Sequence, residues 1–313
     1  MNVSGATAPA VQSALRGLID YAGLFPPAQL GMARAVDRYE EARRGPLAWM
    51  LGRFIVPATR LAELLDALGD REPFELSVIL DAGSDPGSWL DKIRQLLDSI
   101  ASIRDRESLL RIAALETRVP QLQSERDTFD APVGQFGMLA SNAGVRDLPI
   151  FVELPRGPRS DADLPTSLFA LKRSKLGAKV RCGGPSAEDV PSAGELAHFI
   201  CEVTRHSLAW KATAGLHHPI RRADAPTGDA AHGFLNVLAA AVFAEMGAGS
   251  DALCALLDEE DPGAFALDAE GLRVRDRQAG AEALADTRRH HFIAFGSCSF
   301  DDPTRDLTAL GIV

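Results

Sequence analysis

Lysine is scarce in this chain of 313 residues, in which five of the 33 basic side chains are lysine and the others are arginine. Two of the five, Lys179 and Lys211, lie inside short apolar runs that are typical of buried strands. An ammonium group can lose its proton when it is desolvated, whereas a guanidinium group keeps its charge. The two lysines are therefore the first candidates for chemistry.

Cysteine is also sparse, and the four cysteines, Cys182, Cys201, Cys254 and Cys298, are far apart in the sequence. The absence of a C-x-x-C pair excludes the common zinc and redox motifs, and free thiols indicate a cytoplasmic protein. The first nine residues lack a basic region followed by an apolar stretch, so we expect no secretory signal. No apolar run approaches the roughly 20 residues of a membrane span, so we expect no membrane partner.

A surplus of positive charge is absent, because the formal net charge is −10 and no basic stripe occurs. This excludes general nucleic-acid binding. The sequence has neither a G-x-G-x-x-G fingerprint nor a P-loop, so nothing indicates NAD or ATP. The hydrophobic content of 46% and charged content of 24% are ordinary for a globular protein.

Apolar strand-like runs alternate with amphipathic helix-like runs along the chain. The runs predict strands near 19–24, 50–56, 74–81, 110–115, 149–154, 178–182, 208–213 and 291–298. Helices are predicted near 29–43, 58–69, 87–102, 133–143, 163–175, 192–206 and 232–247. Eight alternating units favour an α/β fold of the (β/α)8 TIM-barrel type, formed by residues 1–313 as a single domain. If the first and last strands were absent, the alternative would be an open doubly wound sheet.

Residues 248–290 depart from this alternation. The pattern there predicts a helix near 250–258, a hairpin that turns at Glu270-Gly271, and a second helix near 277–290. We interpret this helix–hairpin–helix segment as an insertion before the last strand. It is expected to serve as a lid or as a contact between copies in a homo-oligomer.

Because side chains alternate along a strand, the apolar face of each strand indicates which residues point into the barrel. Trp210 is expected to face the helices, and Lys211 and Thr213 the interior. The charged residues expected inside are Arg53, Asp81, Glu116, Glu153, Lys179, Arg181 and Lys211. Most of them lie near the carboxyl ends of their strands, where barrel active sites are found. The alternative interpretation is a structural layer of ion pairs.

The segment Lys211-Ala-Thr-Ala-Gly215 is the strongest motif. A desolvated lysine on a late barrel strand can act as a Schiff-base nucleophile, and Lys179 and Arg181 could supply the cation that lowers its pKa. Glu153 could move protons, as could Asp20 and Tyr21 near the amino terminus. Alternatively, Lys211 forms only an ion pair with Glu153.

These motifs resemble class I aldolases of the deoxyribose-phosphate type. In that family one strand carries the Schiff-base lysine with small hydroxyl residues and glycine, and the adjacent strand carries a second lysine and Gly-Gly. Lys211-Ala-Thr-Ala-Gly215 is similar to the first pattern and Lys179-Val-Arg-Cys-Gly-Gly184 to the second, in the reverse chain order. The resemblance covers about fifteen residues. It implies that Lys211 forms the imine and that Lys179 is the neighbour that lowers its pKa.

The segment after Gly215 has residue types that bind anions. It contains His217, His218 and Arg221, followed by His232 and Asn236 one helical turn apart. If a helix begins here above the barrel mouth, its amino terminus could hold a carboxylate or a phosphate. Gly183 and Gly184 could bring backbone amides to the same anion, although a tight turn is the simpler interpretation.

A divalent metal is the main rival, since His217, His218 and His232 could combine with Asp81, Glu116 or Glu153. Neither H-x-H nor H-E-x-x-H spacing occurs. Cys298 could act as a nucleophile or simply as a packed thiol.

The sequence therefore predicts a lyase of aldolase type, or an isomerase, that acts on a small anionic oxo-compound through Lys211, without an organic cofactor. The alternatives are a metal-dependent hydrolase or lyase and a non-catalytic barrel that serves as a scaffold.

Overall fold

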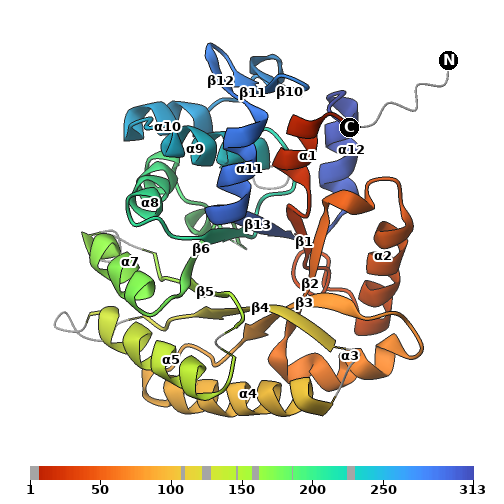
Figure 1. Ribbon diagram of the computed structural model, residues 1–313, viewed down its shortest axis with the longest axis vertical. Coiled ribbons are helices and arrows are strands. Elements are labelled where there is room, and N and C mark those ends of the chain that lie inside the picture. Colours follow the sequence, from red (N-terminus) through yellow and green to blue (C-terminus); the bar gives the residue numbers. More distant parts are fainter. Residues whose placement is uncertain are drawn as a thin grey trace.

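In the computed structural model, eight parallel strands close into a barrel that is surrounded by helices (Figure 1). The structure describes residues 7–106, 110–121, 128–145, 147–156, 162–184, 186–223 and 230–313. The barrel strands are β1 (Ile19–Tyr21), β2 (Leu51–Pro57), β3 (Phe74–Leu80), β4 (Leu110–Arg118), β5 (Ile150–Glu153), β6 (Gly177–Arg181), β7 (Trp210–Thr213) and β13 (Phe292–Ser297). The predicted (β/α)8 barrel is thus confirmed, and the open sheet is wrong.

Closure depends on the first and last strands, which have the weakest sequence signals. β1 and β13 pair in parallel, with Asp20 opposite Gly296, and β13 continues the sheet to β7. β1 also pairs in parallel with β2. Its backbone groups are therefore satisfied on both sides, which an edge strand of three residues would not achieve.

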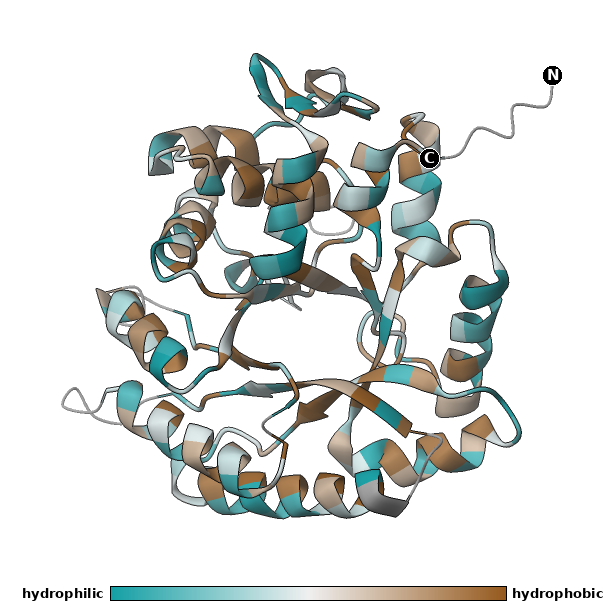
Figure 2. Cartoon of the chain, in the orientation of Figure 1, coloured by the Kyte–Doolittle hydropathy of each residue, from teal (hydrophilic) through white to brown (hydrophobic). Residues whose placement is uncertain are grey.

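The helices form the outer layer of the barrel. They are α2 (Met32–Arg44), α3 (Leu61–Leu68), α4 (Pro86–Arg106), α5 (Asp130–Asn142), α7 (Leu164–Arg173), α8 (Ala193–Arg205), α9 (Phe234–Glu245) and α12 (Asp301–Ala309). The short helix α1 (Pro9–Leu15) precedes the first strand, and neither α1 nor α12 was predicted from the sequence. Figure 2 shows hydrophobic residues on the sides of the helices that face the strands. No helix in the described ranges is long and apolar enough to cross a membrane.

Segment 248–290 contains helix α10 (Ser250–Leu257), a small antiparallel sheet and helix α11 (Ala281–His290). The sheet consists of β10 (Phe265–Asp268), β11 (Gly271–Val274) and β12 (Arg277–Ala279). We expected a helix to start where β12 lies. In Figure 1 this segment lies at one side of the barrel, beside α1 and α9. A separate two-stranded ribbon joins β8 (Arg222–Ala223) to β9 (Ala230–Ala231) after β7.

The packing of β7 shows why its lysine faces inward. Trp210 stacks on Phe292 with ring centroids 4.5 Å apart and meets Phe199 of α8 edge-on at 5.6 Å. Burying this ring between the barrel and its helices is strongly favourable. Since alternate residues of a strand point to opposite faces, Lys211 must point into the barrel.

Candidate functional site

The two buried lysines lie side by side on neighbouring strands. Lys179 of β6 and Lys211 of β7 are direct partners in the parallel register. Both side chains point into the barrel, and their exposed fractions are 5% and 1%. Buried ammonium groups are unfavourable unless they are paired, so their partners determine what this interior can do.

Lys211 reaches side chains of three strands that do not border β7 in the barrel. Its Nζ lies 2.5 Å from Oδ2 of Asp20 on β1 and donates a 2.5 Å hydrogen bond to Oε1 of Glu116 on β4. It also donates to the hydroxyl of Ser77 on β3 at 3.4 Å and lies 5.6 Å from the centre of the Phe151 ring. The ammonium group therefore lies between two carboxylates, one of which, Glu116, also accepts a 2.6 Å hydrogen bond from Ser77.

Glu116 joins the two lysines. Its second oxygen, Oε2, lies 2.9 Å from Nζ of Lys179, which is also 3.2 Å from Oε2 of Glu153. The other oxygen of Glu153 accepts a 2.9 Å hydrogen bond from Nε of Arg181. The result is a continuous buried row in the order Asp20, Lys211, Glu116, Lys179, Glu153 and Arg181.

The charges in this row stabilise one another. Burial alone would raise the pKa of Glu116, but the two ammonium groups outweigh it and hold that pKa far below the ordinary range. The pKa of Glu153 is likewise lowered by Lys179 and Arg181 against the effect of burial. Burial alone would lower the pKa of Lys179, and the carboxylates of Glu116 and Glu153 reverse this and raise it. Both carboxylates are therefore ionised and Lys179 is charged at neutral pH.

This pairing differs from the expected one. Glu153, which we expected beside Lys211, binds Lys179 instead, and Glu116 contacts both ammonium groups. Lys179 was expected to act on Lys211 as a bare cation, but a carboxylate bridges the two lysines. Asp20 is the second carboxylate at Lys211.

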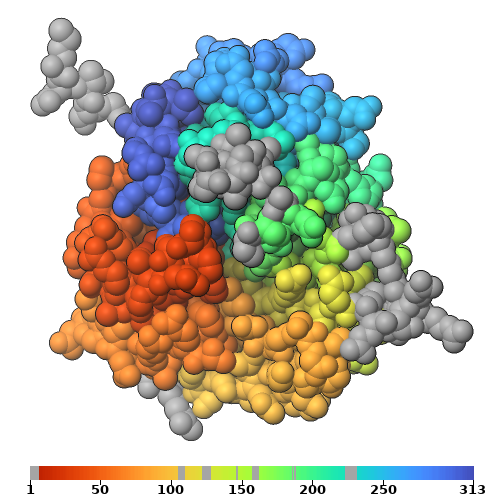
Figure 3. Space-filling model, turned by 180° about the vertical axis from the view of Figure 1, so that it is seen from behind, coloured from red at the N-terminus to blue at the C-terminus, as the bar shows by residue number. Residues whose placement is uncertain are grey.

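The row becomes accessible at the carboxyl ends of the strands. Arg181 ends β6 and is 32% exposed, and Arg118 ends β4, is 56% exposed and lies 3.8 Å from Glu153. Figure 3 shows the molecule from the side toward which the barrel strands run. Arg118 was missed in the sequence because we ended this strand at residue 115. The alternation continues to 118 and would have revealed it.

Two predicted residues lie elsewhere in the barrel. Arg53 is the third residue of β2 and lines a cavity at the amino-terminal end, where its guanidinium lies 3.8 Å from Asp20. Tyr21 points away from Asp20 and packs against Tyr39 and Phe54, with ring centroids 5.9 and 5.7 Å apart. Burial raises the pKa of Tyr21 to about 12, so its place in an aromatic cluster does not fit the expected role in proton transfer.

The residues of the predicted anion-binding helix form hydrogen bonds within the chain. Asn236 on α9 accepts a hydrogen bond from the backbone N–H of Arg221 and donates to the carbonyl oxygens of Leu256 and Glu259. His232 is 1% exposed, and its Nε2 lies 2.7 Å from the carbonyl oxygen of Pro191. These contacts fix the segment after β7 against α10, and both side chains have a structural role here.

The polar side chains around α9 and β13 also have partners within the chain. The guanidinium of Arg221 lies 3.5 Å from Asp258 and 3.7 Å from Glu260. Nδ1 of His218 lies 2.5 Å from Asp306 on α12, and Nδ1 of His217 lies 3.8 Å from Sγ of Cys298. Burial raises the pKa of the Cys298 thiol, which disfavours the nucleophilic thiolate.

The geometry does not bring the predicted metal ligands together. Among the described residues, no group of three His, Cys, Asp or Glu side chains is arranged to hold an ion. His218 and His232 contact different parts of the chain. Asp81 follows β3, is exposed and accepts a hydrogen bond from the N–H of Gly83.

The glycines after β6 permit close packing. A Cβ on Gly183 would lie 2.6 Å from Cα of Gly215, which has a φ of +72°. The two strand ends can approach only because both residues lack side chains. Gly184 is exposed and lies against Asp189, and Thr213 ends β7 at the open side of the row.

Comparison of the sequence with models of protein families and with curated proteins found no match. The likeness to class I aldolases therefore rests on the two strand motifs and on what the barrel interior can do. The fold is compatible with an enzyme that acts on a small molecule.

Proposed function

We propose that this chain is an enzyme of the lyase or isomerase class that acts on a small anionic oxo-compound through an imine at Lys211. The observation that carries the proposal is the position of the Lys211 ammonium between Asp20 and Glu116, with Lys179 on the far side of Glu116. Such a row supplies a potential nucleophile, two proton acceptors and a second proton donor inside one barrel.

The first steps follow from this arrangement. Lys211 must release a proton to Glu116 or Asp20 before its lone pair can attack the carbonyl carbon of the substrate. The carbinolamine then loses water, and the protonated imine draws electrons from the neighbouring carbon. Cleavage of the bond between that carbon and a hydroxyl-bearing carbon, whose hydroxyl proton passes to a carboxylate of the row, releases a carbonyl compound and leaves an enamine. Loss of a proton from the carbon next to the imine to the same carboxylate leaves an enamine as well. Reprotonation and hydrolysis release the product and restore the free amine.

Lys179 and Glu116 can return the proton to the enamine. A proton exchanged between them crosses a short distance, because Nζ of Lys179 and Oε2 of Glu116 are 2.9 Å apart. Removing this proton from Lys179 is opposed by Glu116 and Glu153, which raise its pKa. The substrate must therefore change the balance of charge in the row before the relay can operate.

The arginines at the rim support an anionic substrate for the proposed enzyme. Arg181 and Arg118 both lie near Glu153, which is a single carboxylate. A second anion can therefore bind these guanidinium groups without displacing the buried pairs. A guanidinium binds carboxylate or phosphate through two parallel hydrogen bonds.

Trapping with borohydride tests the proposal. The protein is mixed with a panel of small aldehydes, ketones and 2-oxo acids, reduced, digested and mapped by mass spectrometry. Reduction makes the imine permanent, and the chain has only five lysines to distinguish. We expect the adduct on the peptide that contains Lys211. The Lys211→Arg variant keeps the charge but cannot form an imine, so its adduct should be absent.

Lys92→Met serves as the matched control, since Lys92 is exposed on α4 and outside the buried row. It should trap the same carbonyl compound to the same extent as the unmodified protein. Adducts distributed over the exposed lysines, with none on Lys211 for any compound in the panel, would contradict the proposed imine. Circular dichroism confirms that each variant is folded before trapping.

A further inference from the structure

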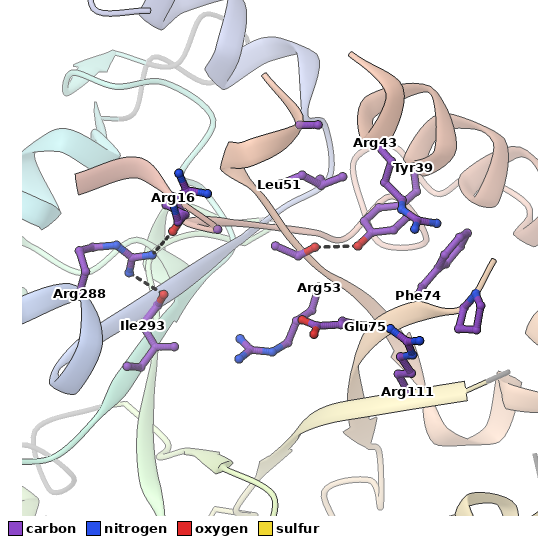
Figure 4. A pocket seen from close by; sticks show the side chains of 14 residues that line it. Arg16, Tyr39, Arg43, Leu51, Arg53, Phe74, Glu75, Arg111, Arg288 and Ile293 are labelled. Atoms are coloured by element: carbon purple, nitrogen blue, oxygen red, sulfur yellow. Dashed lines mark hydrogen bonds between the residues drawn. The ribbon is translucent and has the colours of Figure 1, made fainter. Parts of the chain in front are cut away.

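A cavity of about 520 Å³ opens at the amino-terminal end of the barrel, opposite the rim formed by Arg118 and Arg181. The apolar parts of its wall come from the first residues of three strands: Leu51 of β2, Phe74 of β3 and Ile293 of β13. Five arginines line it: Arg16, Arg43, Arg53, Arg111 and Arg288. Figure 4 shows the side chains of Arg53 and Glu75 directed toward its centre, between Arg288 and Arg111.

The positive charges of this cavity are only partly neutralised. Arg43 is paired with Glu40 at 2.6 Å and lies over the Phe74 ring. Arg53 has Asp20 at 3.8 Å, but that carboxylate is already bound by Lys211 at 2.5 Å. Five guanidinium groups in one cavity repel one another in a chain whose net charge is −10.

The other three arginines have no carboxylate partner within the part of the chain that the structure describes. Arg288 donates to the backbone carbonyls of Phe292, Ile293 and Arg16, which orient the guanidinium and leave its charge intact. Burial lowers the pKa of Arg288 to about 10, so the group remains cationic at neutral pH. Among the described residues, the side chain of Arg16 donates to a neutral group, the amide oxygen of Gln12, and Arg111 makes no ion pair.

Of the described residues that line the cavity, Glu75 alone carries a carboxylate. It lies opposite Arg111 in the register of β3 and β4, and its side chain is exposed. Nε of Arg53 and Nε of Arg288 are buried and have no hydrogen-bond partner among the residues that the structure describes. Buried donors without an acceptor are costly, and an acceptor in the cavity would remove that cost.

We propose that this cavity binds a small polyanion that carries two or more phosphoryl or carboxylate groups. The guanidinium groups come from several walls, so a ligand with separated anionic groups satisfies more of them than a single phosphate does. The volume also leaves room for an organic part against Leu51 and Phe74. The ligand binds at the end of the barrel opposite the rim, and its binding does not depend on imine chemistry at Lys211.

Isothermal titration calorimetry with inorganic pyrophosphate and with citrate tests this proposal at constant ionic strength. The two probes distinguish phosphoryl from carboxylate ligands, and orthophosphate shows whether one anionic group is enough. We expect one site per chain for at least one of the two polyanions, with weaker binding of orthophosphate.

Substitutions of two exposed residues of the cavity should change the affinity for the polyanion in opposite directions. Arg111→Met should weaken binding roughly tenfold by removing a charged donor, whereas Glu75→Gln should tighten it by removing the opposing carboxylate. The control Arg94→Met removes an exposed arginine of α4 that is not among the residues lining the cavity, and it should leave the dissociation constant unchanged. The proposal fails if neither polyanion binds, or if all three variants bind as the unmodified chain does.

Discussion

Nζ of Lys211 lies 2.5 Å from a carboxylate oxygen of Glu116 in the barrel interior, and the side chains of both residues are only 1% exposed. The two residues are 95 positions apart in the sequence and come from β4 and β7. Strands β5 and β6 separate β4 from β7 in the sheet, so the contact forms only when this part of the sheet curves. A buried pair of this kind stabilises the fold little by itself, but breaking it leaves a charge without a partner.

Glu116→Gln should therefore destabilise the protein strongly. The amide keeps the shape of the side chain but removes the charge that two buried ammonium groups share. We expect a loss of about 3–5 kcal/mol in the free energy of unfolding, measured by urea denaturation. Glu63→Gln is the control, because Glu63 pairs with Arg60 on the surface. It should leave the midpoint essentially unchanged. Equal stability of the two variants would contradict the role of Glu116 in neutralising the two buried ammonium groups.

Acid should destabilise the fold through the same carboxylates. The pKa values of Glu116 and Glu153 in the folded state lie below their ordinary value of 4.5. Their contribution to stability is therefore complete above about pH 4.5 and is lost as the pH falls through the lower folded-state values. Urea unfolding between pH 6 and pH 3 should show this decline. The decline should be shallower in Glu153→Gln, which has one fewer such carboxylate, and a flat profile for the unmodified chain would contradict the pairing.

The sequence pattern was sufficient for the barrel and for the direction of its central side chains. Strand periodicity assigned Lys179, Lys211 and Glu153 to the interior, and the structure places them there. The period of two residues indicates the face of a strand but not the height of a residue along the barrel axis. That height depends on the stagger between strands. Arg53 was for this reason grouped with the other interior charges as a substrate-binding residue, whereas it lines the cavity at the amino-terminal end.

Pairing within the interior could not be read from single strands. Which carboxylate meets Lys211 depends on how β1, β4 and β7 are arranged around the closed barrel. The same limit applies to the histidines after β7. Their residue types suited a ligand set, but His232 binds a backbone carbonyl and His218 binds Asp306 of a helix that we had not predicted.

Arg181 should determine the preference for anionic carbonyl compounds, if the proposed function is correct. Arg181→Met removes the exposed guanidinium beside Glu153 and leaves the contacts of Lys211 in place. Borohydride trapping of a 2-oxo acid should become roughly tenfold less efficient, because a charge-assisted contact is lost. Trapping of a neutral aldehyde should change little. Arg205→Met, on the outer surface of α8, is the control and should affect neither compound. A parallel loss for both compounds would assign Arg181 a structural role instead.

Tyr21 lies beside Asp20 in the sequence but belongs to a different environment, and its titration should show this. The chain has two tyrosines. Burial raises the pKa of Tyr21 to about 12, and that of Tyr39, whose hydroxyl donates to the carbonyl oxygen of Gly52, is also raised by burial. Ultraviolet titration of the folded protein should therefore show no tyrosinate between pH 10 and 11. In denaturant both tyrosines should ionise near pH 10.

The Tyr21→Phe variant should keep the trapping of carbonyl compounds, because the ring at position 21 packs with Tyr39 and Phe54 on the helix side of the barrel. A tyrosinate signal near pH 10 in the folded chain, absent from the Tyr21→Phe variant, would instead place this hydroxyl in solvent and restore it as an acid or base.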